Sequence, residues 1–271
     1  MKTNVMNINV NKGVTFLTFK EFEKYNIKHA ISTRHGGVST GEKTSSMNLG
    51  LKTDDDIKTV KENFKLFCDA TNLNYNNVTL ANQTHSDKIR VITKEDVGKG
   101  LHRERDYFDI DGIITNLYDV PLMIHTADCV PVLFADTNKR VIGASHCGWK
   151  GTYEGLSVKM LERMKETFGC NCEDMVCLIG TAIDVCCYEV SKELYDQFKV
   201  RFGGFEDCFR EQDEKFYLDL KLLNKLQLVS EGIKEDKIFV SDICTKCNSN
   251  DLFSHRVLGE GRGMIGTFIS L

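Results

Sequence analysis

Apolar side chains recur every three or four residues in several long segments, the spacing that places them on one face of a helix. In the first of these segments Val60, Phe64 and Phe67 share a face. Gly169 and Gly232 follow the last apolar residues of two later segments, and glycine commonly ends a helix. The pattern predicts helices over residues 55–70, 152–168 and 218–231, and a weaker one over 191–202.

Shorter apolar runs separated by polar turns are typical of strands. The runs 130–135 and 140–145 are joined by a turn too short to hold a crossover helix, so they predict an antiparallel hairpin. No Gly-rich nucleotide-binding motif and no dividing linker is present. We therefore predict one mixed α/β (α+β) domain over residues 1–271 with a central antiparallel hairpin. The predicted strands are 78–81, 89–92, 112–115, 121–126, 130–135, 140–145, 175–179 and 238–240.

The predicted hairpin carries a cysteine and a histidine that we expect to be neighbours. If its turn is centred near Asn138, position 129 faces a position near 147, and antiparallel partners lie about 4.5–5.5 Å apart. Cys129 and His146 then meet at the open end of the hairpin. A glycine-rich turn with Lys150 leads into the next predicted helix, an arrangement that suits an anion such as phosphate.

A neighbouring cysteine and histidine support two kinds of chemistry. The histidine can deprotonate the thiol, which makes Cys129 a nucleophile, or both side chains can bind a metal. His85, in the polar turn after the 78–81 strand, is a candidate third ligand. One cysteine and two histidines match a catalytic zinc with an open fourth position. The alternative without chemistry is a buried Cys129 beside a hydrogen-bonded core histidine.

Composition narrows the class of protein. The 271 residues are 41% hydrophobic and 27% charged, enough for a core, and the formal net charge of −4 argues against a nucleic-acid binder. No apolar run approaches the roughly 18 residues of a membrane helix, and the first residues lack the apolar core of a signal peptide. The 11 cysteines, an odd number, therefore indicate reduced thiols in a cytoplasmic protein.

Several motifs, taken together and in order, resemble one known family. They are NQTHS at 82–86, TADCVPVLFAD at 126–136, HCGWKGT at 146–152 and IGTAIDVCCYEV at 179–190, joined by segments at 32–39, 46–50 and 242–245. The chain resembles the polyphenol oxidase or laccase-domain family, whose members are regarded as purine nucleoside phosphorylases with adenosine deaminase activity. The resemblance implies β-sheet layers flanked by helices. It also implies a zinc, or copper by the older family name, held by His85, Cys129 and His146.

The resemblance implies substrates as well: a purine nucleoside (adenosine, inosine, guanosine or methylthioadenosine) and phosphate, with no nucleic-acid or membrane partner. The protein would be a monomer or a small homo-oligomer. Arg34 and Lys150 are available to hold phosphate, and Asn48 and Gln83 to bind the nucleoside. Asp128 is the candidate to move protons, or else to orient a ligand histidine. The sequence departs from the family at Lys150, where the family usually has arginine.

Other functions stay open on the sequence alone. A Cys–His hydrolase, such as an amidase that edits a peptidoglycan precursor, would use Cys129 and His146 without a metal. A copper polyphenol oxidase would need several histidine-rich sites, and the chain has seven histidines without an H-x-H pair. A binding protein without catalysis would tolerate Cys129→Ala.

The remaining cysteines are interpreted mostly as packing thiols. Cys244 and Cys247 have the spacing of a zinc knuckle and suggest a four-cysteine zinc site with Cys186 and Cys187 or with Cys170 and Cys172. Neither of those two pairs has knuckle spacing, which argues against such a site. Beside Cys186 and Cys187, Asp184 adds a carboxylate that the family pattern lacks.

Overall fold

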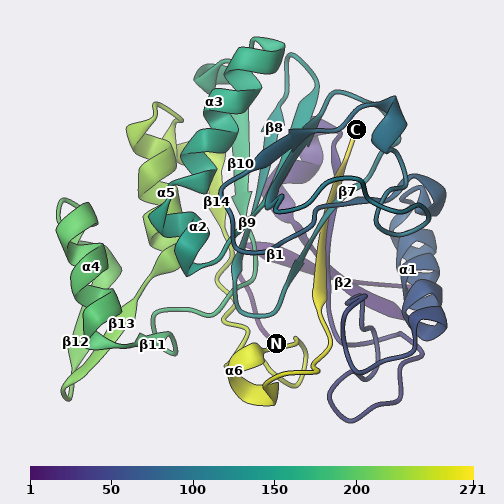
Figure 1. Cartoon of the computed structure of the whole chain (residues 1–271), viewed down its shortest axis with the longest axis horizontal. Coiled ribbons are helices and arrows are strands. Elements are labelled where there is room, and N and C mark those ends of the chain that lie inside the picture. The colour runs from purple at the N-terminus through teal and green to yellow at the C-terminus, as the bar shows by residue number, and fades with distance from the viewer.

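The computed structural model describes residues 1–271, and two six-stranded sheets form its centre (Figure 1). The first sheet has the order β1 (Met6–Asn11), β2 (Val14–Phe19), β3 (Lys28–Ser32), β15 (Ile265–Ser270), β7 (Leu122–Thr126), β4 (Thr79–Leu80). The second has the order β14 (Ile238–Val240), β10 (Met175–Ile179), β8 (Val130–Asp136), β9 (Val141–Cys147), β6 (Gly112–Thr115), β5 (Ile89–Val91). A small third sheet orders β11 (Glu189–Val190), β13 (Lys215–Leu218) and β12 (Phe209–Gln212).

Alternating side chains along the strands explain how the two large sheets pack. In β8, Leu133 faces a core that it shares with Ile124 of the first sheet, so the two sheets lie face to face. The next residue, Phe134, faces the other way, toward a core with α3 (Leu156–Phe168) and α5 (Leu220–Ser230). The outer face of the first sheet packs against α1 (Ile57–Thr71). The result is helix, sheet, sheet and helix in layers, which confirms the predicted mixed α+β fold (Figure 1).

The predicted helices are present, with one correction. The four predicted helices correspond to α1, α3, α4 (Lys192–Phe202) and α5. A short helix, α6 (His255–Leu258), was not predicted. The segment 152–168 is not one helix: α2 (Trp149–Tyr153) ends before Gly155, which has φ +73°, and α3 starts after it. Because Gly155 adopts the left-handed conformation, the chain changes direction between the two helices.

The predicted hairpin of β8 and β9 is confirmed, with a register that differs by one residue. Val130 pairs with Cys147, and Asp136 pairs with Val141 at the turn. The Asp136 side chain accepts hydrogen bonds from two backbone N–H groups of this turn, which sets its length. Cys129 therefore precedes the first paired residue of β8.

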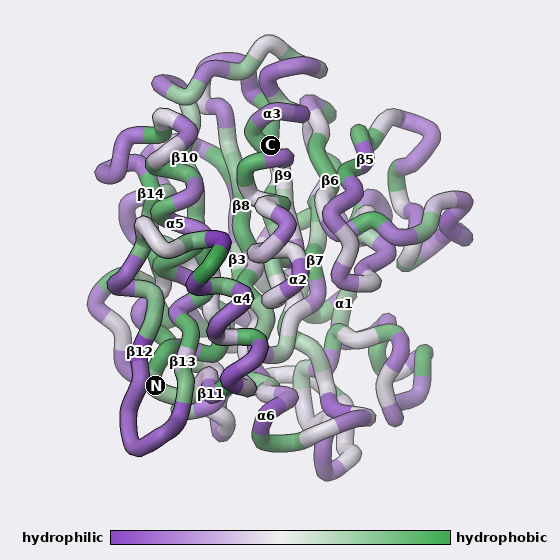
Figure 2. The backbone as a smooth tube through the Cα atoms, turned by 60° about the vertical axis from the view of Figure 1, so that its left-hand side comes forward, coloured by the Kyte–Doolittle hydropathy of each residue, from purple (hydrophilic) through white to green (hydrophobic).

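The prediction missed several strands, chiefly β1–β3 and β15 of the first sheet and the three strands of the small sheet. Figure 2 shows hydrophobic segments along the central strands, whereas the turn between β12 and β13 is hydrophilic. None of the helices combines the length and the apolar character needed to cross a bilayer.

Candidate active site and metal centre

The structure brings His85, Cys129 and His146 together from three places in the fold. His85 lies in the loop after β4, Cys129 just before β8, and His146 within β9. Their candidate ligand atoms all lie within 4.8 Å of one another, and the Cys129 Sγ is 3.9 Å from the His85 Nε2. The two imidazole rings are 4.8 Å apart, centroid to centroid. One sulfur and two nitrogens in this arrangement can hold a metal ion, since zinc and copper both accept this donor set.

Gly148 leaves the space in which these side chains meet. A Cβ at this position would lie 3.0 Å from the Cys129 Sγ and 3.0 Å from the His85 Cδ2. Both contacts are tight, so a larger residue would push the sulfur or the ring out of place. The glycine that the sequence offered as part of an anion-binding turn therefore serves the His85–Cys129 contact directly.

Asp111, just before β6, holds the His146 ring and the backbone of the loop that carries His85, and it was not predicted. Its carboxylate is fully buried and accepts a 2.8 Å hydrogen bond from the His146 Nδ1. The same carboxylate accepts backbone N–H groups of Thr84, His85 and Ser86, at 2.8–3.1 Å. With Nδ1 engaged, the His146 Nε2 is the atom left to face Cys129. Nothing in the spacing of Asp111 marks it in the sequence, because the contact depends on how β6 pairs with β9.

Electrostatics favour a thiolate in this group. Burial acts to raise the pKa of Cys129, but the neighbouring His146 and His85 outweigh it and lower the pKa to about 6. Burial acts to lower the pKa of His146, yet the Cys129 thiolate and Asp111 raise it to about 10. Without a metal, a thiolate–imidazolium pair is therefore the favoured state at neutral pH. A metal ion binds the same thiolate and takes the place of the imidazolium proton.

Asp128 lies beside this group but points away from it. Its carboxylate accepts hydrogen bonds from the Thr245 Oγ1 (2.5 Å), the Ser254 Oγ (3.0 Å) and the Arg256 backbone N–H (2.7 Å). Its backbone has φ +89°, which is uncommon for a residue other than glycine. The side chain thus ties the strand end that carries Cys129 to the C-terminal segment of the chain.

The three candidate ligands open on a cavity of about 310 Å³, within the size range of small-molecule sites. Gln83, which the sequence analysis offered as a substrate residue, lines it and holds the backbone of His125 by accepting its N–H and donating to its C=O. Three cationic side chains that the sequence analysis missed also line the cavity: Lys52, Arg105 and Arg262. The Arg262 Nε is buried and has no hydrogen-bond partner.

Three predicted substrate residues lie outside this cavity lining. The Arg34 guanidinium donates to the backbone C=O groups of Ser45 and Ser249 and lies 4.9 Å from the Phe253 ring centroid. Lys150 is exposed, with its Nζ 5.4 Å from the ring centroid of its neighbour Trp149.

Asn48, the third of them, is fully buried. Its side-chain oxygen accepts the backbone N–H groups of Gly50 and Met264, at 2.8 and 3.0 Å. Both of those residues line the cavity. Asn48 therefore shapes the cavity wall from behind.

The fold and the site together define a class: a layered α+β protein in which one cysteine and two histidines, a candidate metal-binding group, line a small cavity. Residues 28–271 match the family described as multi-copper polyphenol oxidoreductase laccase, and the chain belongs to that family. This confirms the resemblance that the sequence motifs indicated.

The chain is also similar to individual proteins and to a solved structure. The chain is 33% identical over 246 residues to the purine nucleoside phosphorylase YlmD of Bacillus subtilis, covering 89% of this chain and 87% of that protein. It is 26% identical over 243 residues to the adenosine deaminase RL5 of an unknown prokaryotic organism, covering 89% and 92%. The crystal structure of the hypothetical protein YfiH of Bacillus licheniformis superposes with a TM-score of 0.89 at 30% identity, covering 99% of both chains.

Proposed function

We propose that this protein is a metal-dependent enzyme of purine nucleoside metabolism, a purine nucleoside phosphorylase that also deaminates adenosine. The observation that carries the proposal is the group His85, Cys129 and His146, whose ligand atoms lie within 4.8 Å of one another at the base of a cavity. The names of the relatives supply the substrate class. We further expect it to act in the cytoplasm, where its 11 free thiols stay reduced.

In this proposal zinc is the ion, and its chemistry when bound is that of a Lewis acid that polarises an oxygen or lowers the pKa of a bound water. His85, Cys129 and His146 hold it. Asp111 keeps the His146 Nδ1 protonated, so that Nε2 is free as a ligand. Asp128 is a positioning residue, because its carboxylate is occupied by three donors that hold the chain next to Cys129.

Phosphorolysis requires that phosphate be held near C1′ of the ribose, and an anion of this charge needs cationic partners. We assign this role to Lys52, Arg105 and Arg262, which line the cavity, in place of Arg34 and Lys150. The buried Arg262 Nε, which lacks a partner within the chain, is the donor with most to gain from an oxyanion. Gln83 keeps one amide N–H after its bonds to His125 and is assigned to the nucleoside.

The test is to incubate the pure protein with adenosine or inosine, with and without phosphate, and to identify the products. Phosphate-dependent release of free base with ribose 1-phosphate is expected, together with inosine formed from adenosine. A metal-loaded protein that converts neither nucleoside would overturn the proposal.

A second candidate, a Cys–His hydrolase, is favoured by one observation: Asp111, His146 and Cys129 form a chain of carboxylate, imidazole and thiolate. Such an enzyme would need no metal. Chelation separates the two, because a thiol hydrolase keeps its activity after the metal is removed and loses it on alkylation of Cys129. A multicopper oxidase is not favoured, because the structure gathers histidines into a potential metal group in one place only.

A further inference from the structure

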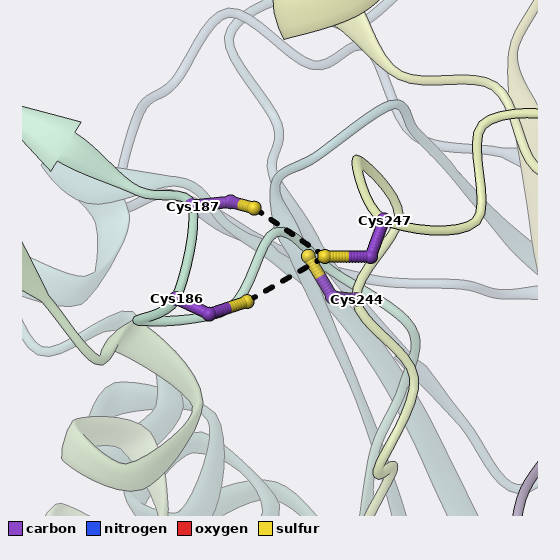
Figure 3. Close-up of side chains that lie close together, drawn as sticks. All are labelled: Cys186, Cys187, Cys244 and Cys247. Atoms are coloured by element: carbon purple, nitrogen blue, oxygen red, sulfur yellow. Dashed lines mark hydrogen bonds between the residues drawn. The ribbon is translucent and has the colours of Figure 1, made fainter.

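Four cysteines outside the His85–Cys129–His146 group lie close together in a second place. Cys186 and Cys187 lie in the turn before β11, and Cys244 and Cys247 in the turn after β14 (Figure 3). The Cys247 Sγ is 3.4 Å from that of Cys187 and 3.7 Å from that of Cys186. All four sulfurs lie within 4.8 Å of one another, and they point toward a common centre (Figure 3).

These distances suit one tetrahedral ion. With Zn–S bonds of about 2.3 Å, the sulfurs of a zinc tetrahedron lie about 3.8 Å apart, close to the separations of the Cys247 sulfur from those of Cys186 and Cys187. A disulfide needs its sulfurs at about 2.05 Å, and all four cysteines are free thiols. Four sulfurs so close together also leave room for a single ion and not for the larger frame of an iron–sulfur cluster.

The backbone brings the two turns together without help from the cysteines. Ala182 and Cys244 form an isolated parallel bridge, and the Thr245 N–H donates to the Ala182 C=O at 3.0 Å. The Asp184 N–H points to the Cys244 Sγ at 3.4 Å, a contact that favours the thiolate. The Asp184 carboxylate accepts a 2.7 Å ion-paired hydrogen bond from the buried Lys221, which fixes the same turn from the other side. The cluster is therefore preorganised.

We propose that Cys186, Cys187, Cys244 and Cys247 bind a structural zinc ion. On binding, the four thiols release their protons to solvent and each thiolate donates one electron pair, so no oxidant or reductant is needed. The site has four protein ligands, as expected for a structural ion, whereas a reacting ion keeps one position open. Knuckle spacing in the sequence does not predict this site, because the adjacent pair meets the Cys244–Cys247 turn only through the parallel bridge.

An ion in this cluster would also support the segment that carries Cys129. Thr245, next to Cys244, donates to the Asp128 carboxylate, and the Ile183 N–H donates to the Asp128 C=O. Asp128 precedes Cys129 in the chain. The zinc would therefore stabilise the two turns that hold Cys129 from behind, although it lies outside the cavity.

The test is metal analysis of the full-length protein, purified under reducing conditions, as wild type and as Cys187→Ala/Cys247→Ala. Both substituted side chains are at or near the surface, and Cys172→Ala, in a half-buried cysteine outside the cluster, is the control. The double variant is expected to lose one zinc per chain and to unfold at lower temperature, while Cys172→Ala keeps the wild-type zinc content. Cobalt-exchanged wild type is expected to show strong thiolate-to-cobalt absorption that the double variant largely loses.

Three results would overturn the proposal: equal zinc in the double variant and wild type, a visible iron–sulfur chromophore in the protein as purified, or a disulfide within the cluster after purification under reducing conditions. His85→Ala keeps this inference separate from the proposed function. That variant is expected to lose the cavity metal and keep the cluster zinc, so nucleoside turnover can fail while the cluster zinc persists.

Discussion

The two cysteine-containing centres of this protein differ in what surrounds them. Cys129 lies between two histidines at the base of a cavity, and the neighbouring charges lower its pKa to about 6, although burial opposes this. Cys187 belongs to a cluster of four cysteines without a histidine, and burial and the adjacent thiol of Cys247 raise its pKa to about 11. Mixed cysteine and histidine ligands at a cavity suit chemistry, whereas four sulfur ligands suit a structural ion. We therefore expect cysteine to have two roles in this protein, each set by its neighbours.

The strongest test of this contrast is His85→Ala. Loss of a ligand should cost more than the roughly 10–100-fold typical of an outer-shell partner, so we expect nucleoside turnover to fall by more than about 100-fold. The melting temperature of the metal-free protein should change little, because His85 is exposed. Turnover and metal content measured together check this. His102→Ala, in another exposed histidine, should leave both at the wild-type level, and an active His85→Ala enzyme would refute the assignment.

Asp111→Asn tests the orientation of the histidines without removing a ligand. The amide keeps the shape but loses the charge that holds the protonated Nδ1 of His146, so metal affinity in the cavity should fall by about 10–100-fold. Competition with a chelator measures this, and the four-cysteine cluster should keep its ion. Asp109→Asn is the matched control, since Asp109 is exposed and close in sequence. An equal loss in both variants would mean that loop charge, and not the His146 contact, is responsible.

Arg262→Gln tests the cationic wall of the cavity. A charged hydrogen bond contributes about 1.5–3 kcal/mol, so the KM for phosphate should rise by about tenfold or more while the metal content stays unchanged. Lys150→Gln, outside the cavity lining, is the control and should leave the KM for phosphate unaltered. If Lys150→Gln raised the KM for phosphate and Arg262→Gln did not, the phosphate site would include Lys150, as the sequence analysis suggested.

The smallest effect is a difference in thiol reactivity in metal-free protein. Because the thiolate is the nucleophile, alkylation of Cys129 by iodoacetamide should reach half its maximal rate near pH 6 and fall about tenfold per unit below that pH. Cys187, whose pKa is raised, should react slowly at pH 7 and faster as the pH increases. Peptide mass spectrometry after timed alkylation measures both rates. Equal alkylation rates of Cys129 and Cys187 at pH 7 would contradict the difference in pKa between the two thiols.

Local pattern was enough for much of the layered core. Strands β6, β10 and β14 and helix α1 lie within a residue or two of the predicted ranges, because their apolar periodicity reflects burial directly. Strands β1 and β2 were missed: Ile8 and Val10 are exposed, so this edge hairpin depends on pairing with β3 and not on a strong apolar face.

By itself, then, the sequence determined the fold class, the family and the approach of Cys129 to His146, since a short turn joins the strands that carry them. Only the tertiary structure decided the rest. The contact of Asp111 with His146 requires the pairing of β6 with β9. The cations of the cavity and the four sulfurs of the cluster come from segments far apart in the chain. Spacing along the chain cannot report such contacts, because they are created when sheets and loops pack.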